Sequence, residues 1–466
     1  MNTDLPNIVL VVLDTARRDR FGCYGYERPT SPTVDSLARD GMLVENMFAN
    51  APWTPPSHAS MFTGLYPSEH GCQWGTEIRL REGVGVTLAE WLGDLGYQTM
   101  CVTNNGLISA ATGLTRGFSS VTSRLDLERG VRRMARRARK GLFGGDGGGA
   151  VINRYLRRTL PRVRRPMFLF VNYLECHWAY APRPSMVRRV GGPRFRFPNG
   201  LHYRFAIADK VGPWEAIATA DERTTEIYST LYDGEVASAD MHLGNLLEDL
   251  ERSGHLSGNS IVIVTSDHGE HLGEHGLADH HASLDDHIVR VPFVAWGPGV
   301  VEAGRRSGMW ELLDVFASLA RLLDRPLPAS YLEKRRSSLF TSGETFEPGY
   351  AFAEWACWNE KELGRLSARN PSFDFAPIAR DIVSVRDERF KLVRGSDGTE
   401  FLFDCVSDPE EDVDVSADQP EVANRLRHRL DAAIGSWPAP AGEKGAEYTD
   451  AERREVEEQL AALGYI

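Results

Sequence analysis

A hydroxyl, two carboxylates and an imidazole stand where they could act together on a phosphate or sulfate ester. Thr54 opens the run TPPSHASMFTG, which follows an apolar stretch and has the pattern of a helix start. Free N–H groups at a helix start attract an anion, so a hydroxyl there is placed to attack phosphorus or sulfur. Asp14 and the pair Asp267-His268 each follow a strand-like run. Because ligands of open α/β sheets bind beyond the carboxyl ends of the strands, we expect these groups to converge.

The same side chains have the chemistry of a ligand set for one divalent cation. Asp14, Asp267 and His268 would bind it, with the Thr54 hydroxyl as fourth ligand. Such a cation lowers the pKa of a bound hydroxyl and offsets charge on the ester oxygens. For Asp14 alone a helix cap is the simpler interpretation, so the prediction depends on the run TSDHGEHLGEHG around Asp267. A second metal stays an open alternative, and its candidate ligands are close in sequence: His275, Asp279 and His280.

Further polar side chains lie near these groups or at other strand ends. His177 follows a strand-like run and is placed to donate to a substrate oxygen or to protonate the leaving group. His280 and His281 are candidates for the cation or acid that faces the transferred group. His58, one helical turn after the hydroxyl, is placed to orient it, and Asn104 is a candidate substrate ligand. A purely structural role stays open for each of these histidines.

The elements that must position these residues alternate between strand-like and helix-like runs. Strands are predicted by apolar runs at 8–13, 42–47, 98–103, 167–174, 260–265 and 291–295. Helices are predicted by periodicity at 32–40, 87–95 and 227–252. Ser57 is expected to cap a helix that begins near His58. The alternation predicts an α/β fold with a mostly parallel central sheet sandwiched by helices.

The pattern changes after residue 325. Short strand-like pieces at 382–386, 390–394 and 400–403 predict an antiparallel meander, followed by helices at 420–434 and 450–463. We therefore expect a catalytic domain at 1–325 and a smaller C-terminal α+β subdomain with an antiparallel sheet at 326–466.

Residues 124–165 are rich in arginine and contain a glycine-rich break. Two interpretations stay open. The segment is either a solvated helical insertion with a mobile loop, or a basic lid or patch for an anionic substrate or lipid headgroup. Membrane association through this segment is therefore an open alternative.

The composition is that of an ordinary globular enzyme, with 42% hydrophobic and 25% charged residues. A formal net charge of -12 argues against a general nucleic-acid binder. The six cysteines form no CxxC pair, which argues against a zinc knuckle or a disulfide framework. The first apolar run is too short to span a bilayer and lacks the flanks of a signal peptide, so we expect a cytoplasmic protein.

These motifs resemble the sulfatase family of the alkaline phosphatase superfamily. Residues 6–14 resemble its first metal-binding strand, 54–64 its nucleophile motif and 265–276 its second metal motif. The piece Glu175-x-His177-x-x-Tyr180 is similar to the family's Asp-x-His-x-Pro-Tyr. The resemblance covers almost the whole chain and implies an alkaline phosphatase-like fold and a metal-dependent ester hydrolase.

The departures from the family pattern concern the chemistry. Family members convert a Cys or Ser at the position of Thr54 to formylglycine, and threonine cannot form this aldehyde because its Cβ carries a methyl group. We therefore expect no formylglycine. His58 replaces the motif arginine, and Thr15 replaces the second aspartate of the usual pair. Asn104 and His281 stand where the family has lysines.

A threonine that attacks directly is similar to the phosphate-handling branches of the superfamily, where the hydroxyl forms a phosphothreonine. His268 in place of an oxygen ligand moves the metal preference from calcium, which remains possible, towards manganese or zinc. We expect a hydrolase of phosphate or sulfate esters, with phosphate preferred. Its substrate would be a small molecule or an anionic ester of a glycan or lipid headgroup. The alternatives are a phospho-group transferase and a catalytically degenerate binding protein.

Overall fold

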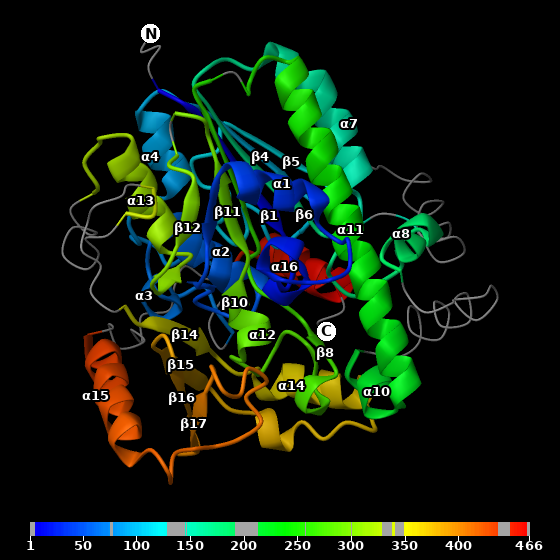
Figure 1. Cartoon of the computed structure of the whole chain (residues 1–466), viewed down its shortest axis with the longest axis vertical. Helices are drawn as coiled ribbons and strands as arrows, with labels where there is room; N and C mark the ends of the chain where they lie inside the picture. The colour runs from blue at the N-terminus through cyan, green and yellow to red at the C-terminus, as the bar shows by residue number, and fades with distance from the viewer. Residues whose placement is uncertain are drawn as a thin grey trace.

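An eight-stranded sheet forms the centre of the computed structural model (Figure 1). The structure describes residues 5–74, 78–127, 145, 147–191, 213–256, 258–299, 301–328, 338–340, 349–436 and 448–463. The sheet has the strand order β12 (Gly304–Arg306), β2 (Met42–Val44), β11 (Phe293–Trp296), β7 (Ser260–Thr265), β1 (Asn7–Leu13), β6 (Met167–Tyr173), β4 (Gln98–Thr103) and β5 (Ser120–Ser123).

The strands that carry the site are parallel. β1 lies between β6 and β7, with Val12 opposite both Asn172 and Thr265. β4 continues the parallel order beyond β6, whereas β11 runs antiparallel to its neighbours β7 and β2. The predicted mostly parallel sheet is confirmed. Its consequence is that β1, β4, β6 and β7 end at the same edge, where polar side chains can meet.

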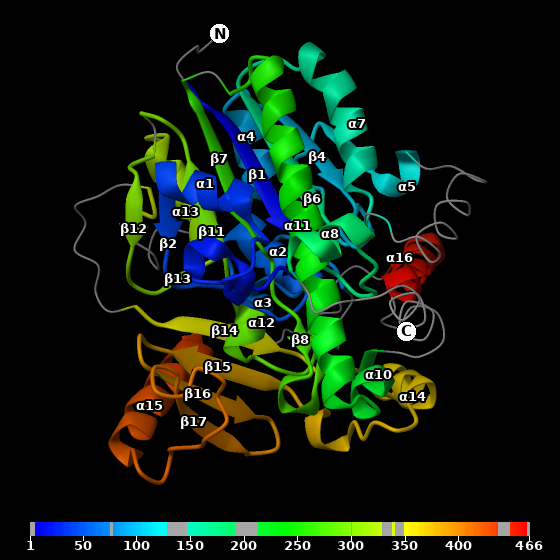
Figure 2. The same cartoon turned by 45° about the vertical axis from the view of Figure 1, so that its right-hand side comes forward.

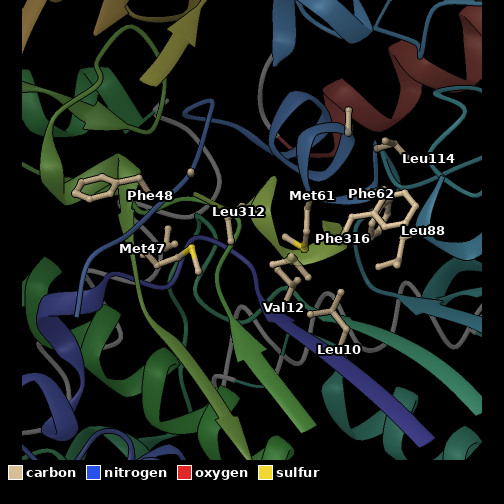
Figure 3. Close-up of a cluster of buried hydrophobic side chains, with 14 of the residues drawn as sticks. Leu10, Val12, Met47, Phe48, Met61, Phe62, Leu88, Leu114, Leu312 and Phe316 are labelled. Atoms are coloured by element: carbon tan, nitrogen blue, oxygen red, sulfur yellow. The ribbon is translucent and has the colours of Figure 1, made fainter. Parts of the chain in front are cut away.

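Alternate residues of β1 pack against helices on opposite faces of the sheet, because successive side chains of a strand point to opposite sides. Ile8, Leu10 and Val12 belong to the cluster shared with α2 (Thr54–Thr63), α4 (Leu88–Asp94) and α13 (Asp314–Leu322). Figure 3 shows Met61 and Phe62 of α2 in this cluster. Each fully buried apolar side chain of this kind contributes about 1.5–3 kcal/mol of transfer free energy, which anchors α2 on the sheet.

The opposite face is covered by three other helices (Figure 2). They are α1 (Pro32–Asp40), α7 (Gly149–Thr159) and α11 (Glu222–Arg252). Val9, Val11 and Leu13 of β1 pack among their buried residues. The result is a three-layer arrangement with the sheet in the middle, as the sequence predicts.

Two predicted strands are wrong as single elements. The run 42–47 divides into β2 and β3 (Met47–Phe48), and the latter joins a small sheet with β10 (Arg290–Val291) and β13 (Trp310–Glu311). The run 291–295 divides between β10 and β11 at Pro292, which has no N–H to give to a ladder.

The predicted cap by Ser57 is also wrong. α2 begins at Thr54 with Trp53 as its N-cap, and the Ser57 hydroxyl donates to the carbonyl of Asp267 at 2.6 Å instead. The earlier start is possible because Pro55 and Pro56 occupy the first turn, where backbone N–H groups lack helical partners anyway. Thr54 is therefore itself part of the helix start.

The C-terminal region contains a four-stranded antiparallel sheet, in the order β14 (Ala351–Trp355), β15 (Ile382–Arg386), β16 (Phe390–Gly395) and β17 (Glu400–Asp404). The predicted meander is confirmed, and β14 is an additional strand. α15 (Pro420–Ser436) packs on this sheet through Leu426 and Leu430. α16 (Asp450–Leu463) lies apart from α15 and closer to α14 (Glu360–Arg369) (Figure 2). A domain boundary at residue 325 stays a prediction.

Only the two ends of the arginine-rich segment are described. α5 (Arg124–Leu127) precedes the part from 128 to 144, which lies outside the described residues together with the predicted cluster Arg132, Arg133, Arg136 and Arg137. In α7, Arg154 and Arg158 are exposed, and Arg157 pairs with Asp249 at 3.0 Å. Among the helices that are described, none is both long enough and apolar enough to cross a membrane.

Candidate active site

The predicted ligands of a metal converge at the carboxyl edge of the central sheet. Asp14 follows β1, and Asp267 and His268 follow β7. All three are fully buried, and each offers a ligand atom within 4.8 Å of the others. The fourth predicted ligand is also in place, because Thr54 Oγ1 lies 3.4 Å from His268 Nε2.

Each aspartate in this group keeps one oxygen that accepts no hydrogen bond from the described residues. Asp14 Oδ2 accepts from Asn105 and Asn172, both at 2.9 Å, while its Oδ1 accepts none. Asp267 Oδ1 accepts from the backbone of Thr15 at 3.1 Å, while its Oδ2 accepts none. A buried carboxylate oxygen without a partner is costly unless a cation compensates it. The donor set therefore fits a divalent metal.

The electrostatics of the two aspartates agree with this interpretation. Burial, together with the charge of Asp267, raises the pKa of Asp14. Burial would also raise the pKa of Asp267, but the neighbouring imidazole of His268 outweighs it and lowers that pKa. Two carboxylates that oppose each other's ionisation inside a protein are held charged most readily by a bound cation.

Asn105 holds the Thr54 hydroxyl and was not predicted. Its Nδ2 donates to Thr54 Oγ1 at 3.1 Å as well as to Asp14. Its backbone N–H donates to Thr103 Oγ1 at 2.9 Å, and its Oδ1 accepts from Leu107 at 3.0 Å, which fixes the amide orientation. The predicted neighbour Asn104 is buried, and its amide makes no hydrogen bond within the described part of the chain.

A left-handed backbone conformation follows the first aspartate. Thr15 has φ of 59°, which is unfavourable for a β-branched residue and costs about 1–3 kcal/mol. The same conformation lets its N–H donate to Asp267 and its carbonyl accept from the Tyr232 hydroxyl at 2.7 Å. These contacts hold the turn in place and keep β1 and β7 joined at the site.

A second buried group lies beside the first. Its members are Asp279, His280 and His281, and the rings of His280 and His268 are 4.3 Å apart between centroids. Burial would lower the pKa of His280, but the carboxylates of Asp279 and Glu270 raise it to about 10. Burial lowers the pKa of His281 to about 4. At neutral pH His280 is therefore a cation and His281 is neutral.

A sulfatase family profile matches residues 6–325. The chain belongs to the sulfatase family. Arylsulfatase K of Canis lupus familiaris is 23% identical over 92% of this chain and 82% of its own length. An N-acetylgalactosamine-6-O-sulfatase of Bacteroides thetaiotaomicron is 22% identical over 92% of this chain and 93% of its own. The chain is therefore a hydrolase of a family whose named members cleave sulfuric esters.

Solved structures share this fold. The phosphonate monoester hydrolase of Agrobacterium radiobacter has a TM-score of 0.70 and 20% identity, covering 93% of this chain and 96% of that one. A putative sulfatase from Bacteroides thetaiotaomicron also has a TM-score of 0.70, with 18% identity and 96% coverage of both chains. The fold that the resemblance implies is confirmed.

In this sulfatase-family site, His177 lies close to the second group, and His58 belongs to the nucleophile helix α2. The rings of His177 and His280 are 5.3 Å apart between centroids. His58 Nδ1 donates to the Thr54 carbonyl at 2.9 Å, lies 3.5 Å from Asp267 Oδ2, and its ring contacts Phe170. The contact of His58 is with the backbone of Thr54, so orientation of the hydroxyl falls to Asn105. The predicted roles of both histidines in the reaction stay predictions.

The three candidate ligands of a second metal do not all lie together in this sulfatase-family protein. His275 pairs with Asp285 at 3.0 Å and with Asp412 at 3.4 Å, and its side chain is 29% exposed. It is not part of the buried group that contains Asp279 and His280. Sequence proximity is misleading here because residues 274–276 turn outward through a left-handed His275, with φ of 52°.

Proposed function

We propose that this protein is a metal-dependent hydrolase of phosphate or sulfate esters that uses Thr54 as nucleophile and prefers phosphate esters. The observation that carries the proposal is the position of Thr54 Oγ1. It lies 3.1 Å from the Asn105 amide and 3.4 Å from His268 Nε2, at the edge of a buried group in which Asp14 Oδ1 and Asp267 Oδ2 accept no hydrogen bond from the described residues. A hydroxyl in that environment is an activated nucleophile rather than a helix cap.

The metal would be held by Asp14, Asp267 and His268, with Thr54 as the fourth ligand. When bound, a divalent cation there lowers the pKa of the hydroxyl and offsets charge on the ester oxygens. Two carboxylates, one imidazole and one hydroxyl suit manganese or zinc better than calcium, which prefers six or more oxygen ligands.

The residues of the chain then divide the remaining work. Asn105 donates an N–H to Thr54 Oγ1, and the proton of the hydroxyl passes to water, which frees a lone pair of Oγ1 for attack. Oγ1 forms a bond to phosphorus while the bond from phosphorus to the leaving alcohol breaks, and His177 gives that alcohol its proton. The charged His280 faces the transferred group, where a fixed cation stabilises developing negative charge. Water then releases the phosphate from the phosphothreonine.

The preference for phosphate follows from the second half of this reaction. A formylglycine hydrate carries two hydroxyls on one carbon and can expel sulfate by re-forming its carbonyl. Thr54 has a single hydroxyl, so its ester is released only by attack of water on the phosphorus or sulfur atom. A phosphothreonine intermediate of this kind has precedent among covalent phosphoryl carriers.

The test compares wild type with Thr54→Ala on 4-nitrophenyl phosphate, bis(4-nitrophenyl) phosphate and 4-nitrophenyl sulfate, with manganese added. We expect a loss of about 1,000-fold or more in kcat for the variant, because the nucleophile is gone. Thr63→Ala, at the other end of the same helix, is the matched control and should retain activity. Mass spectrometry of acid-quenched wild type should find phosphate on the peptide that contains Thr54.

Two outcomes would change the assignment. Unchanged activity in Thr54→Ala removes the nucleophile, and a preference for the aryl sulfate reverses the order of substrates. Capture of the phosphate by added glycerol instead of water would identify a transferase. The names of the relatives make anionic glycan esters the next substrates to assay.

A further inference from the structure

Three arginines from separate parts of the chain meet around Asp286, at the border between α12 (Asp286–Val289) and the C-terminal sheet (Figure 2). Arg290 of β10 and Arg386 of β15 approach the same carboxylate oxygen, Asp286 Oδ2, at 3.8 Å and 3.0 Å. Arg18, in the segment that follows β1, is the third member and lies within electrostatic range of Asp286. We call these three residues the arginine cluster.

Within the described part of the chain, no hydrogen bond or ion pair joins the Arg18 side chain to another residue. Its guanidinium lies over the ring of Tyr24, with Cζ 4.2 Å from the ring centroid, and its Nε is buried. The adjacent Arg17, by contrast, pairs with Asp19 at 2.8 Å and with Glu274 at 2.6 Å. Burial lowers the pKa of Arg18, yet a guanidinium stays protonated in proteins, so an unbalanced positive charge remains.

The carboxylates beside the arginine cluster are already balanced. Arg386 donates to Asp286 Oδ2 through both Nε and Nη2, at 3.1 Å and 3.0 Å. Lys391 pairs with the buried Glu411 and lies 3.4 Å from Asp286 Oδ1. Two carboxylates therefore face four cations, and the other two arginines of the cluster have no carboxylate of their own.

Arg290 contributes a second donor that is not satisfied. Its Nη2 donates to Asn46 Oδ1, whereas its Nε is buried and has no acceptor among the described residues. Burial and then the charge of Arg18 lower the pKa of Arg290 to about 10, so the two guanidiniums repel each other. A buried N–H without an acceptor costs free energy, which the oxygen of an anionic ligand would recover.

The ring of Tyr24 covers one face of the Arg18 guanidinium and leaves its edge available. The five N–H donors of a guanidinium point outward in its plane, and no described residue accepts from those of Arg18. Phosphate and sulfate groups accept two parallel N–H bonds from one such edge. Arg386 is committed to Asp286, so it adds positive charge to the cluster rather than free donors.

The charge and burial of the cluster select the class of anion. Two guanidiniums without carboxylates of their own match a doubly charged oxyanion, whereas a monocarboxylate would balance only one of them. The formal net charge of -12 on the whole chain repels a polyanion such as nucleic acid. The side chains of Arg290 and Arg386 are 25% and 5% exposed, so the cluster can be reached from solvent but favours a small group.

We propose that Arg18 and Arg290, next to Arg386, form a binding site for one phosphate or sulfate group outside the metal group. The bound oxyanion accepts N–H bonds from the first two arginines and offsets the repulsion among all three. Because Arg386 belongs to the C-terminal sheet and the other two arginines do not, the anion also strengthens the contact between the C-terminal region and the rest of the protein. The site shares no residue with the metal group, so it stands whether or not Thr54 is the nucleophile.

The test removes Arg18, whose loss breaks no hydrogen bond within the described residues. Arg18→Gln is compared with wild type and with Arg39→Gln, which removes the same charge from an exposed position of α1. Metal is first removed with EDTA, so that the metal group does not hold the anion. Isothermal titration calorimetry measures the binding of inorganic phosphate, inorganic sulfate and methyl phosphate at constant ionic strength. Thermal unfolding of each protein is followed in phosphate and in chloride.

We expect at least one of the three ligands to bind wild type and Arg39→Gln equally, and to bind Arg18→Gln at least about tenfold more weakly. Phosphate should raise the unfolding temperature of wild type more than that of Arg18→Gln, because the general stabilisation by phosphate salts is common to both. Binding of methyl phosphate as tight as that of inorganic phosphate would identify a phosphate ester as the natural source of the group. Weaker binding of methyl phosphate would identify the free anion.

The behaviour in chloride gives a second, independent readout. Arg18→Gln should unfold there at the same temperature as wild type or at a higher one, since it loses a cation that has no partner. Arg18→Glu supplies a carboxylate to the cluster and should raise the unfolding temperature further while abolishing anion binding. Absence of binding by wild type, equal binding by wild type and Arg18→Gln, or a lower unfolding temperature of Arg18→Gln in chloride would overturn the proposal.

Discussion

Two buried groups of aspartate and histidine lie side by side at the end of the sheet, and they differ in where their charge is balanced. Asp14 and Asp267 of the first group each keep an oxygen that accepts no hydrogen bond from the described residues. In the second group, Asp279 Oδ1 lies 2.8 Å from His280 Nδ1 and 3.3 Å from His281 Nδ1. The second group thus contains a histidine whose pKa is raised to about 10, so it carries a cation of its own.

This difference teaches that a set of ligand-type residues is not by itself a metal site. In both groups the candidate ligand atoms lie within 4.8 Å of one another. The first is assembled from the ends of two strands far apart in sequence, while the second is three consecutive residues that pair with each other. We therefore expect one metal at the first group and a protein-borne cation, His280, at the second.

The largest effect should come from removing a ligand of the first group. Asp267→Asn should lose the metal and lower kcat by about 1,000-fold or more, because metal stabilisation of the transition state is worth several kcal/mol. The counterpart Asp279→Asn should keep the metal. Elemental analysis by mass spectrometry of both purified variants checks this, and equal metal loss in the two would erase the distinction between the groups.

Next in size is the loss of the protein-borne cation. His280→Gln should lower kcat by about 100-fold, the effect of removing one stabilising donor from a transition state, without changing the metal content. Steady-state kinetics on the aryl phosphate, together with elemental analysis, measures both quantities. If metal binding is lost instead, His280 belongs to the first group in solution.

A smaller effect should follow from the asparagine that holds the hydroxyl. Asn105→Ala should lower kcat about 10- to 100-fold and leave KM nearly unchanged, because Asn105 positions Thr54 and Asp14. Asn104→Ala is the matched control at the adjacent position and should act on KM if Asn104 binds substrate. The same kcat loss in both variants would contradict the assignment of the hydroxyl contact to Asn105.

The smallest effect concerns an acid–histidine contact at the surface. A hydrogen bond from His275 to Asp285 raises the pKa of His275 to about 9, above its usual value of 6.5. The stabilisation is therefore complete below about pH 6.5 and is lost as the pH rises through about 9. Because His275 is partly exposed, His275→Asn should cost only about 1 kcal/mol near pH 6 and nothing near pH 10.

Urea unfolding at the two pH values measures this difference. Asparagine tolerates the left-handed backbone at position 275, so the substitution should not add strain of its own. A cost that is equal at both pH values would show that the contact stabilises by packing rather than by charge.

The fold was predictable where a physical pattern was long and local. The apolar runs of β1, β6 and β7 are buried along their whole length and read directly as central strands. Parallel order then places Asp14 and Asp267 at one edge, which is why the convergence of these two carboxylates could be predicted without a structure. β14 and the division of the run 291–295 at Pro292 were not predicted, because the pairing of these strands depends on partners far away in sequence.

The parts of the site that were not predicted depend on side-chain orientation. Asn104 and Asn105 are adjacent after the same strand, and local hydrogen bonds with Thr103 Oγ1 and the Leu107 N–H hold the Asn105 amide toward Thr54. The different charges of His280 and His281 likewise depend on Glu270, which lies ten residues earlier and whose Oε1 is 2.9 Å from His280 Nδ1. Sequence spacing carries no information about either choice.

The backbone at Thr15 has a consequence for how this molecule tolerates change. Asparagine or glycine would adopt that conformation at lower cost, so the segment would become sturdier with either of them. A looser peptide there would also be free to swing its N–H away from Asp267. Thr15 therefore lowers the stability of the protein while it keeps this N–H oriented toward Asp267. We expect a screen for thermal stability alone to select substitutions at this position that reduce activity.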